Sequence, residues 1–392
     1  MRILHTSDWH IGRTFHGHQT LDALSDVLRA LVAQVAEREV DVVLVAGDVF
    51  DSATPAAACY GILTDTLVAL RETGARVIVT SGNHDSAARL GFQAKLLRDG
   101  IHVLTDPLAT GTPVTVADAH GPVHFYGIPY LEPTLVRHLW EGVELRTQAQ
   151  TLAHAMDLVR ADAAARRAAG EGGRSVAMAH CFAVGGLIDT QPTPHLERDI
   201  QQGGLDVVPL SAFDGPDYVA LGHIHGHSML SDRVRYSGAP LHYSFGENPN
   251  RGSWLVDLDA EGLAAVEWVP LPVPRPLATL RAPLQTLLTD PAYDAYADGW
   301  VRAEYTDTAQ QVDVMRRLQT RFPHCAEVRH VPAERAEADT RSFSGRVRAA
   351  RNDVELIDGF LAHVRNGVGA TDAERDLVRD VIGEKTAAEA SA

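Results

Sequence analysis

Five short apolar runs in the chain each end in a group of polar, chemically reactive residues. Runs of this length, rich in Val and Ile and bounded by turn residues, are typical of β-strands buried on both faces. The runs, each with the motif that follows it, are Arg2–Leu4 with Asp8-Trp9-His10, Val40–Ala46 with Gly47-Asp48, Ala75–Thr80 with Gly82-Asn83-His84-Asp85, Ser175–Ala179 with His180, and Asp217–Leu221 with Gly222-His223-Ile224-His225. The reactive motifs therefore lie at predicted strand ends.

Helical patterns separate the first three runs. Leucines recur at helical spacing between residues 21 and 38, which predicts a first amphipathic helix. Thr54 as N-cap and Pro55 at the first helical position predict a second helix, which ends near Gly74. Residues 87–98 predict a third. The alternation of strands and helices predicts a layered α/β domain.

The next part of the chain mixes β-structure with one long helix. Residues 101–129 alternate short β runs with Gly and Pro turns, and the Ala-rich stretch Arg146–Ala169 predicts a helix. The Gly- and Pro-rich residues 185–204 predict an irregular loop over the strand ends. Ser253–Asp259 and Leu263–Val269 predict a hairpin that closes the first domain.

Prolines at alternate positions from Pro270 to Pro276 predict a stiff, extended linker and a domain boundary. Beyond it, Trp300–Thr306, Gln310–Arg321 and Cys325–Val331 predict a small β-α-β unit. Residues 333–346 are charged and irregular, and we expect a flexible connector there.

Two amphipathic helices are predicted near the C-terminus. The first carries apolar residues from Leu356 to Val364, and the second opens with a capping box of Thr371 and Glu374. Two helices this short cannot bury their apolar faces alone, so they either dock on the rest of the chain or bind a partner. The small, polar residues from Lys385 onward predict a disordered tail.

Composition and charge limit the classes of function. The chain has 392 residues, 45% apolar and 22% charged, which predicts a globular protein of two or three domains. The formal net charge of −16 argues against a protein whose whole surface binds nucleic acid. It leaves room for a local basic groove and for bound divalent cations.

Cys59, Cys181 and Cys325 lie far apart without a CxxC motif, which predicts a reduced, cytoplasmic protein without disulfide bonds. Asp8 and His10 stand where a signal peptide needs an apolar core, so we expect no export. No run approaches the ~18 apolar residues of a membrane-spanning helix, so we expect no membrane partner.

The strand ends carry the chemistry. In open α/β sheets, ligands bind outside the carboxyl ends of the strands. If the five strands share one sheet, their ends place three carboxylates, one carboxamide and five imidazoles along one edge. These are Asp8, Asp48, Asp85, Asn83, His10, His84, His180, His223 and His225. Such a set is typical of a hydrolase with two metal ions.

Within this set, Asp48 on its glycine turn is the natural bridging carboxylate. Mixed Asp, Asn and His ligands favour Mn, Fe or Zn over Mg or Ca. His223 and His225 lie two apart on an extended stretch, so both can face the same side. His84 is better placed to act on substrate, by stabilising phosphoryl oxygens or by protonating the leaving group, and Asp85 could orient its imidazole.

Each motif alone has an ordinary structural interpretation. Gly82-Asn83-His84-Asp85 could be a simple turn, and His180 could be a hydrogen-bonded core histidine. The ordered set, with every member at a strand end, favours a metal centre instead. Cys181 is interpreted as a small buried residue. The histidines outside the pattern are interpreted as surface residues: His16, His18, His120, His124 and His195.

The order of motifs DxH, GD, GNHD, H and GHxH resembles the calcineurin-like metallophosphoesterases. More specifically, the chain resembles the SbcD family, the nuclease subunits of bacterial SbcCD complexes, in the segments MRILHTSDWHIGR, VAGDVFDS, TSGNHDS and DYVALGHIH. The resemblance implies a metallophosphoesterase β-sandwich flanked by helices in residues 1–270 and a small α/β DNA-capping domain in residues 277–332. It also implies C-terminal helices in residues 346–384 that bind an SbcC-type ATPase.

The resemblance also implies roles for single residues. It implies that His84 is catalytic, that the metal is manganese and that two copies pair through helices of the nuclease domain. One metal ion would be held by Asp8, His10, Asp48 and His225, and the other by Asp48, Asn83, His180 and His223. The implied activities are 3′–5′ exonuclease on double strands and endonuclease on single strands and hairpins. Distant relatives carry a second histidine where this chain has Asp51, so that histidine's role cannot be transferred.

Three hypotheses follow. The first is a metal-dependent DNA nuclease that processes DNA ends in repair, recombination and replication. The second is a small-molecule phosphodiesterase or protein phosphatase on the same metal centre. The third is a non-enzymatic scaffold whose metal site is vestigial. The residues beyond the proline linker favour the first, because a phosphatase acting alone has no need of them.

Overall fold

The structure, a computed structural model, describes residues 1–97, 100–184, 207–332, 350–365 and 369–389. The chain divides into two compact units, Met1–Pro274 and Arg275–Ala392. The loop predicted over residues 185–204, with His195, and the connector predicted over residues 333–346 lie outside the described residues.

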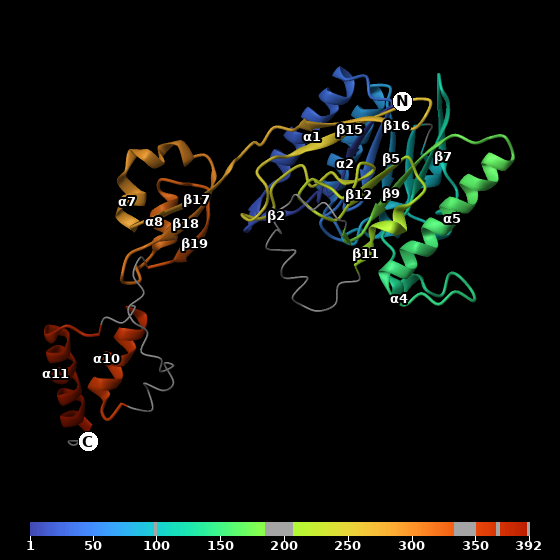
Figure 1. Cartoon of the computed structure of the whole chain (residues 1–392). Helices are drawn as coiled ribbons and strands as arrows, with labels where there is room; N and C mark the ends of the chain where they lie inside the picture. The colour runs from blue at the N-terminus through green and yellow to red at the C-terminus, as the bar shows by residue number, and fades with distance from the viewer. Residues whose placement is uncertain (98–99, 185–206, 333–349, 366–368, 390–392) are drawn as a thin grey trace. The chain divides into compact units, whose positions relative to one another are not determined.

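Two six-stranded sheets form the centre of the first unit (Figure 1). In spatial order, the first sheet contains β16 (Leu263–Pro270), β15 (Gly252–Leu258), β1 (Arg2–Thr6), β4 (Val42–Ala46), β5 (Arg76–Thr80) and β6 (Ile101–Leu104). The second contains β13 (Ser228–Met229), β14 (Val234–Tyr236), β12 (Tyr218–Gly222), β9 (Arg174–His180), β8 (Gly121–Gly127) and β7 (Val114–Asp118). The strands that lead into the reactive motifs run parallel to one another within each sheet.

Helices cover the outer face of each sheet. On the first sheet lie α1 (Leu21–Glu37) and α2 (Ala57–Glu72), and on the second lie α4 (Pro133–Val136), α5 (Gln148–Ala168) and η3 (Leu210–Phe213). The shorter elements are α3 (Ala87–Leu90), η1 (Ala94–Leu96), η2 (Pro107–Ala109), the β2–β3 ribbon (Thr14–Phe15 and His18–Gln19) and the β10–β11 pair (Ala183–Val184 and Val208–Pro209). The unit is therefore layered as helix, sheet, sheet, helix, which confirms the predicted α/β sandwich.

The five motif strands do not share one sheet, because β9 and β12 belong to the second sheet. Each of these strands is buried on both faces. On β4, Val43 and Val45 pack under the helices, while Val42 and Leu44 pack between the two sheets. The same alternation holds on the strands of the second sheet. A strand that is buried on both faces is apolar along its whole length, whether helices cover both faces or a second sheet covers one of them. The hydrophobic pattern therefore cannot show whether the five strands form one sheet or two.

Some helix boundaries differ from prediction. The second helix begins at Ala57 rather than at Pro55, and its N-cap Ala56 makes no side-chain capping bond. The third helix ends at Leu90 instead of near residue 98, since the chain turns at Gln93, where φ is 65°. The long helix agrees well with prediction and starts with a capping box of Thr147 and Gln150.

The second unit contains a three-stranded parallel sheet where we predicted a β-α-β unit. The missed elements are the first strand and the helices that follow it. In chain order the elements are β17 (Leu277–Ala282), α7 (Leu284–Thr289), η4 (Pro291–Tyr296), β18 (Trp300–Tyr305), α8 (Val314–Gln319) and β19 (Cys325–His330). Helix α8 is shorter than the predicted 310–321 because Asp313 has a left-handed φ of 54°. A compact apolar core joins the sheet to α7 and α8.

Two helices complete the described chain, α10 (Asp353–Val364) and α11 (Asp372–Glu389). The predicted capping box is confirmed, because Glu374 N–H donates to Oγ1 of Thr371 at 3.3 Å and Thr371 N–H donates to Oε2 of Glu374 at 2.8 Å. The prediction of a disordered tail from Lys385 was wrong for residues 385–389, since α11 continues to Glu389, and residues 390–392 lie outside the described residues. No helix in the described residues is long and apolar enough to cross a membrane.

Candidate metal centre

The reactive motifs meet where the carboxyl ends of the two sets of parallel strands come together. The first sheet supplies Asp8, His10, Asp48, Asn83 and His84. The second sheet supplies His180, His223 and His225. All the predicted site residues are thus brought together, in one place but from two sheets.

The backbone at this junction is held in unusual conformations. Asp8, His10 and Asp48 have φ values of 53°, 45° and 48°, and His223 has a φ of 110°. Such positive values are unfavourable for non-glycine residues and persist only where the surrounding structure fixes them. Here Asp8 N–H donates to the Gly47 carbonyl at 3.0 Å, and His10 N–H donates to the Asp48 carbonyl at 2.9 Å. Since the chain leaves the extended conformation at His223, the prediction that His223 and His225 lie on one extended stretch was wrong.

Glycines allow the two sheets to approach closely. A Cβ atom at Gly47 would lie 2.4 Å from Nδ1 of His180, and one at Gly222 would lie 1.9 Å from the carbonyl oxygen of Ala46. Neither position can therefore hold a side chain unless the junction opens.

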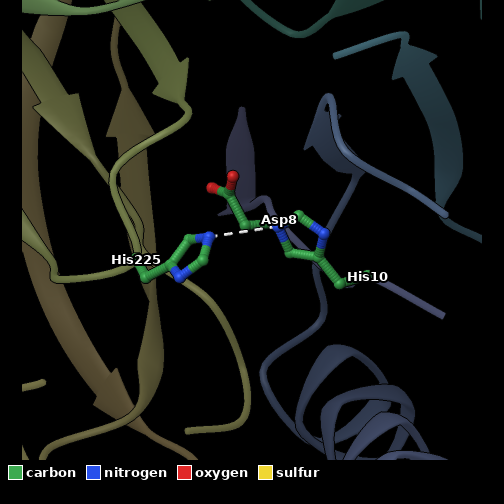
Figure 2. A group of neighbouring side chains, drawn as sticks. All are labelled: Asp8, His10 and His225. Carbon is green, nitrogen blue, oxygen red and sulfur yellow. Dashed lines mark hydrogen bonds between the residues drawn. The ribbon is translucent and has the colours of Figure 1, made fainter. Parts of the chain in front are cut away.

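One cluster is formed by Asp8, His10 and His225, whose ligand atoms lie within 4.8 Å of one another (Figure 2). Nε2 of His10 lies 3.1 Å from Nε2 of His225 and 3.5 Å from Oδ2 of Asp48. Asp8 and His10 are fully buried. Two imidazoles and two carboxylates thus face a common point.

A second cluster is formed on the other side of Asp48. Oδ1 of Asn83 lies 3.0 Å from Nε2 of His180 and 3.0 Å from Nδ1 of His223. Nε2 of His180 lies 3.3 Å from the same Oδ2 of Asp48 that faces His10. Asp48 is therefore shared by the two clusters, as a bridging carboxylate would be.

The donor atoms fit a cation. Nδ1 of His180 lies 3.0 Å from the carbonyl oxygen of Ala46, which can only accept, so Nδ1 carries the proton. When the ring carries this proton alone, Nε2 of His180 presents a lone pair to Oδ1 of Asn83 and Oδ2 of Asp48. Three acceptors that face one another need a positive charge between them, and imidazole, carboxylate and amide oxygen are ordinary ligands of a divalent metal.

The pKa values of the site agree with this interpretation. Burial lowers the pKa of His10 and of His223 to about 3, so both imidazoles are neutral at neutral pH and have a lone pair available. Burial disfavours charge on His180 as well, but the Asp48 carboxylate more than offsets it and raises the pKa of His180 to about 9. A proton on His180 and a metal ion are alternative ways to place positive charge beside Asp48.

Asp85 does not orient His84 as predicted. Its Oδ2 accepts hydrogen bonds from the N–H groups of Val49 at 3.0 Å and Gly82 at 2.8 Å, and its Oδ1 accepts from Phe50 at 2.8 Å. Burial raises the pKa of Asp85 to about 6, although the amide donors favour its charged form. Asp85 therefore ties the Asp48 turn to the Asn83 turn through the backbone.

His84 lies at the open side of the centre, with 38% of its side chain exposed. The Asp51 carbonyl oxygen lies 2.9 Å from its Nδ1, which leaves Nε2 as the free ring nitrogen. His84 N–H also donates to Oδ1 of Asp48 at 2.8 Å. An imidazole held in this way can contact a molecule that reaches the centre from solvent.

Residues outside the motifs were partly misjudged from sequence. His124 is buried rather than on the surface, and its ring nitrogens lie 2.9 Å from Oγ1 of Thr115 and 3.2 Å from the Glu171 carbonyl oxygen. Cys181 is buried, as predicted. Glu247 and Arg251, which contact His225, were missed. Their spacing of four residues was the available signal, but they follow no predicted strand.

Comparison with known proteins fits this geometry. The family model for calcineurin-like phosphoesterases matches residues 1–227, more than half of the chain. This chain belongs to the calcineurin-like phosphoesterase family. The phosphoesterase is therefore a hydrolase that depends on divalent metal ions, as predicted, and the ligand clusters described above lie within the matched residues.

A second family model, SbcD_C, described as the type 5 capsule protein repressor C-terminal domain, matches residues 273–365 of the phosphoesterase. The two matches together confirm the resemblance to SbcD-type nucleases. Solved structures similar to the phosphoesterase include TT1561 of Thermus thermophilus, with 14% identity over 69% of this chain and 98% of that chain at a TM-score of 0.38. Another is a dimetal phosphatase from Danio rerio, with 14% identity over 69% of this chain and 98% of that chain at a TM-score of 0.41.

Proposed function

We propose that this phosphoesterase is a manganese-dependent DNA nuclease, the nuclease subunit of an SbcCD-type complex that processes DNA ends. One observation carries the proposal: Oδ2 of Asp48 faces both His10 and His180, so two ligand sets share one carboxylate. Combined with the match of residues 273–365 to the SbcD C-terminal domain, this arrangement supports a nuclease with two metal ions.

Each ligand set draws on both sheets. One set is Asp8, His10, Asp48 and His225, and the other is Asp48, Asn83, His180 and His223. Bound ions would supply an activated water and neutralise the charge of the phosphodiester. Manganese suits the mixture of imidazole and carboxylate ligands. The neutral amide of Asn83 limits the negative charge that a phosphate would meet.

His84 is the proposed catalytic residue. Its exposure and its held Nδ1 leave Nε2 for contact with substrate. Because Nδ1 already donates to the Asp51 carbonyl, Nε2 can donate a proton to the leaving oxygen, or a hydrogen bond to a phosphoryl oxygen, from the imidazolium form of the ring. Either role requires contact with substrate and no bond to metal.

Exposed apolar side chains outside the metal centre support the binding of partner proteins. Phe92 and Leu96 beside α3 are 74% and 76% exposed, which supports pairing of two copies through the nuclease domain. On the C-terminal helices, Phe360 is 49% exposed and Leu377 is 63% exposed. We propose that these helices bind an SbcC-type ATPase and that the three-stranded unit at residues 277–332 is the DNA-capping domain.

The test compares DNA with a small ester. Purified protein with Mn²⁺ is given blunt double-stranded, single-stranded and hairpin DNA, and separately bis-p-nitrophenyl phosphate. We expect cleavage of DNA, including 3′–5′ digestion of blunt ends, and Asp48→Ala should abolish it. Cleavage of the small ester alone would instead identify a small-molecule phosphodiesterase.

A truncation separates catalysis from partner binding. Protein that ends at Ala350, before α10, should keep its basal hydrolysis but lose binding to an SbcC-type ATPase in a pull-down. Persistent binding by the truncated protein would assign the partner site to another part of the chain.

A further inference from the structure

Glu247 is a buried carboxylate beside the metal centre that belongs to neither ligand set. Its side chain is 1% exposed, and its Oε1 lies 3.1 Å from Nδ1 of His225. It lies in the loop between β14 and β15, so no strand end places it there. A buried carboxylate destabilises the folded state unless it is paired and hydrogen-bonded. The contacts of Glu247 therefore indicate its role.

The second oxygen of Glu247 is fully occupied. Oε2 accepts hydrogen bonds from the backbone N–H of Tyr243 at 3.1 Å and from the Arg251 guanidinium. Arg251, itself 2% exposed, also donates to the carbonyl oxygen of His225. Arg251 thus donates hydrogen bonds to both Glu247 and the backbone of His225, and these bonds fix the position of Glu247 relative to His225.

This arrangement determines which ring nitrogen of His225 can bind a metal. A carboxylate can only accept, so Nδ1 of His225 carries the proton and donates it to Oε1. Nε2 then presents its lone pair toward Nε2 of His10, 3.1 Å away (Figure 2). The other histidines differ: Nδ1 of His180 faces a neutral carbonyl, and Nδ1 of His10 lies 3.3 Å from Asp51 without hydrogen-bond geometry.

We propose that Glu247 is a positioning residue for the metal centre: it holds His225 in the tautomer and orientation that present Nε2 to the ion shared with Asp8, His10 and Asp48. The inference rests on the proposed ligand sets. Carboxylates that hold a ligating histidine in this way raise its basicity and fix its ring, and their loss lowers metal affinity by about 10- to 100-fold.

Glu247→Gln tests the tautomer directly. Both oxygens of Glu247 serve as acceptors, but glutamine has one oxygen and one NH₂ group. The Tyr243 N–H and the Arg251 guanidinium, which both donate to Oε2 in the wild type, require the amide oxygen as their acceptor. The NH₂ group of the glutamine therefore faces Nδ1 of His225. His225 must then accept at Nδ1 and carry its proton on Nε2, where it blocks the ligand atom.

Two comparison variants separate positioning from charge. Asp51→Asn removes a carboxylate that is also close to a ligating histidine, at 3.3 Å from Nδ1 of His10, but makes no hydrogen bond to it. Its Oδ1 also accepts from Arg13 at 3.2 Å, a contact that asparagine can keep. Glu267→Gln removes a carboxylate that pairs with Arg38 at 3.3 Å and is 61% exposed, far from any predicted ligand in sequence.

The experiment measures Mn²⁺ affinity of the full chain by calorimetry and the protonation of His225 by ¹⁵N NMR of metal-free protein. We expect Glu247→Gln to weaken the affected site by about 10- to 100-fold and to move the His225 proton from Nδ1 to Nε2. Asp51→Asn and Glu267→Gln should leave the His225 tautomer unchanged and weaken Mn²⁺ binding less.

Three results would overturn the proposal: wild-type affinity in Glu247→Gln, an equal loss in Asp51→Asn, or an Nε2-protonated His225 in the metal-free wild type. The last measurement decides the question even if Glu247→Gln does not fold. Wild-type protein that binds Mn²⁺, responds to Glu247→Gln as expected and yet leaves DNA intact would support this inference and contradict the proposed nuclease function.

Discussion

Nδ1 of His180 donates a hydrogen bond of 3.0 Å to the carbonyl oxygen of Ala46, and this bond joins the two sheets at the metal centre. Gly222 lies against the same carbonyl, where a Cβ atom would approach to 1.9 Å. Gly222→Ala should therefore push the sheets apart and displace His180. We expect a loss of about 1–3 kcal/mol in the free energy of unfolding, measured with urea, together with weaker Mn²⁺ binding.

Gly226→Ala is the matched control, because a Cβ atom at Gly226 would meet no heavy atom within 4 Å among the described residues other than its two chain neighbours. If both variants unfold at the same urea concentration and bind Mn²⁺ equally, the close approach at Gly222 has no role in stability.

Asp85→Asn should loosen the turns that carry Asp48 and Asn83. Asp85 uses both oxygens to accept from three N–H groups, and asparagine offers one acceptor and places an NH₂ group against donors. We expect a loss of about 1–3 kcal/mol in the free energy of unfolding. The exposed Asp106→Asn is the control, since only Oδ1 of Asp106 accepts from Leu108 N–H, at 3.0 Å. Equal stability of the two variants would contradict the role given to Asp85.

His84→Gln should separate catalysis from metal binding. We expect turnover to fall by about 10²- to 10⁴-fold, because glutamine cannot supply a proton, while Mn²⁺ affinity stays close to that of the wild type. Hydrolysis rates and calorimetric titration with Mn²⁺ measure the two effects. Ligand atoms of His10, Asp48 and His84 lie within 4.8 Å of one another, so a loss of affinity would assign His84 to the ligands.

Stability should decrease in acid through His5, which is buried between the sheets. Its Nε2 donates to the Leu221 carbonyl at 3.1 Å and its Nδ1 accepts from the Tyr218 hydroxyl at 2.9 Å. Burial lowers its pKa to about 3, whereas the unfolded value is about 6.5. Below about pH 6.5 the unfolded chain therefore binds a proton that the folded chain does not, and the folded state loses about 1.4 kcal/mol per pH unit until about pH 3.

His5→Gln removes this titration, since glutamine can donate to Leu221 and accept from Tyr218 without gaining a charge. Urea unfolding of metal-free wild type and variant at about pH 7, 6 and 5 should show a shallower loss in His5→Gln. Parallel pH dependence in the two proteins would show that His5 takes up its proton in the folded chain as readily as in the unfolded chain, contrary to this prediction.

The motif residues could be predicted because each follows an apolar run that really is a strand. The division of those strands between two sheets could not, because β4 and β9 are buried on both faces whichever layers cover them. The left-handed backbone at Asp8 and His10 gave no signal either, since neither residue is glycine. These conformations follow from contacts across the junction, which arise only after both sheets have formed.

Glu247 and Arg251 illustrate a second limit. A buried ion pair forms between residues four apart in a loop, and the same spacing is common among solvated surface pairs. The contact with His225 marks Glu247 as part of the site, and that contact joins residues 22 positions apart. Strand β17 was missed for a simpler reason: residues 277–282 follow directly on the prolines that predict an extended linker up to Pro276.

The junction of the two sheets gives a bound ion a second effect. Because each ligand set includes side chains from both sheets, an ion held there cross-links the two halves of the fold. Ligands that bind only the folded state raise its stability by mass action, so the melting temperature should rise with metal concentration and fall on chelation. Thermal unfolding thus becomes a readout of metal preference that needs neither DNA nor catalysis.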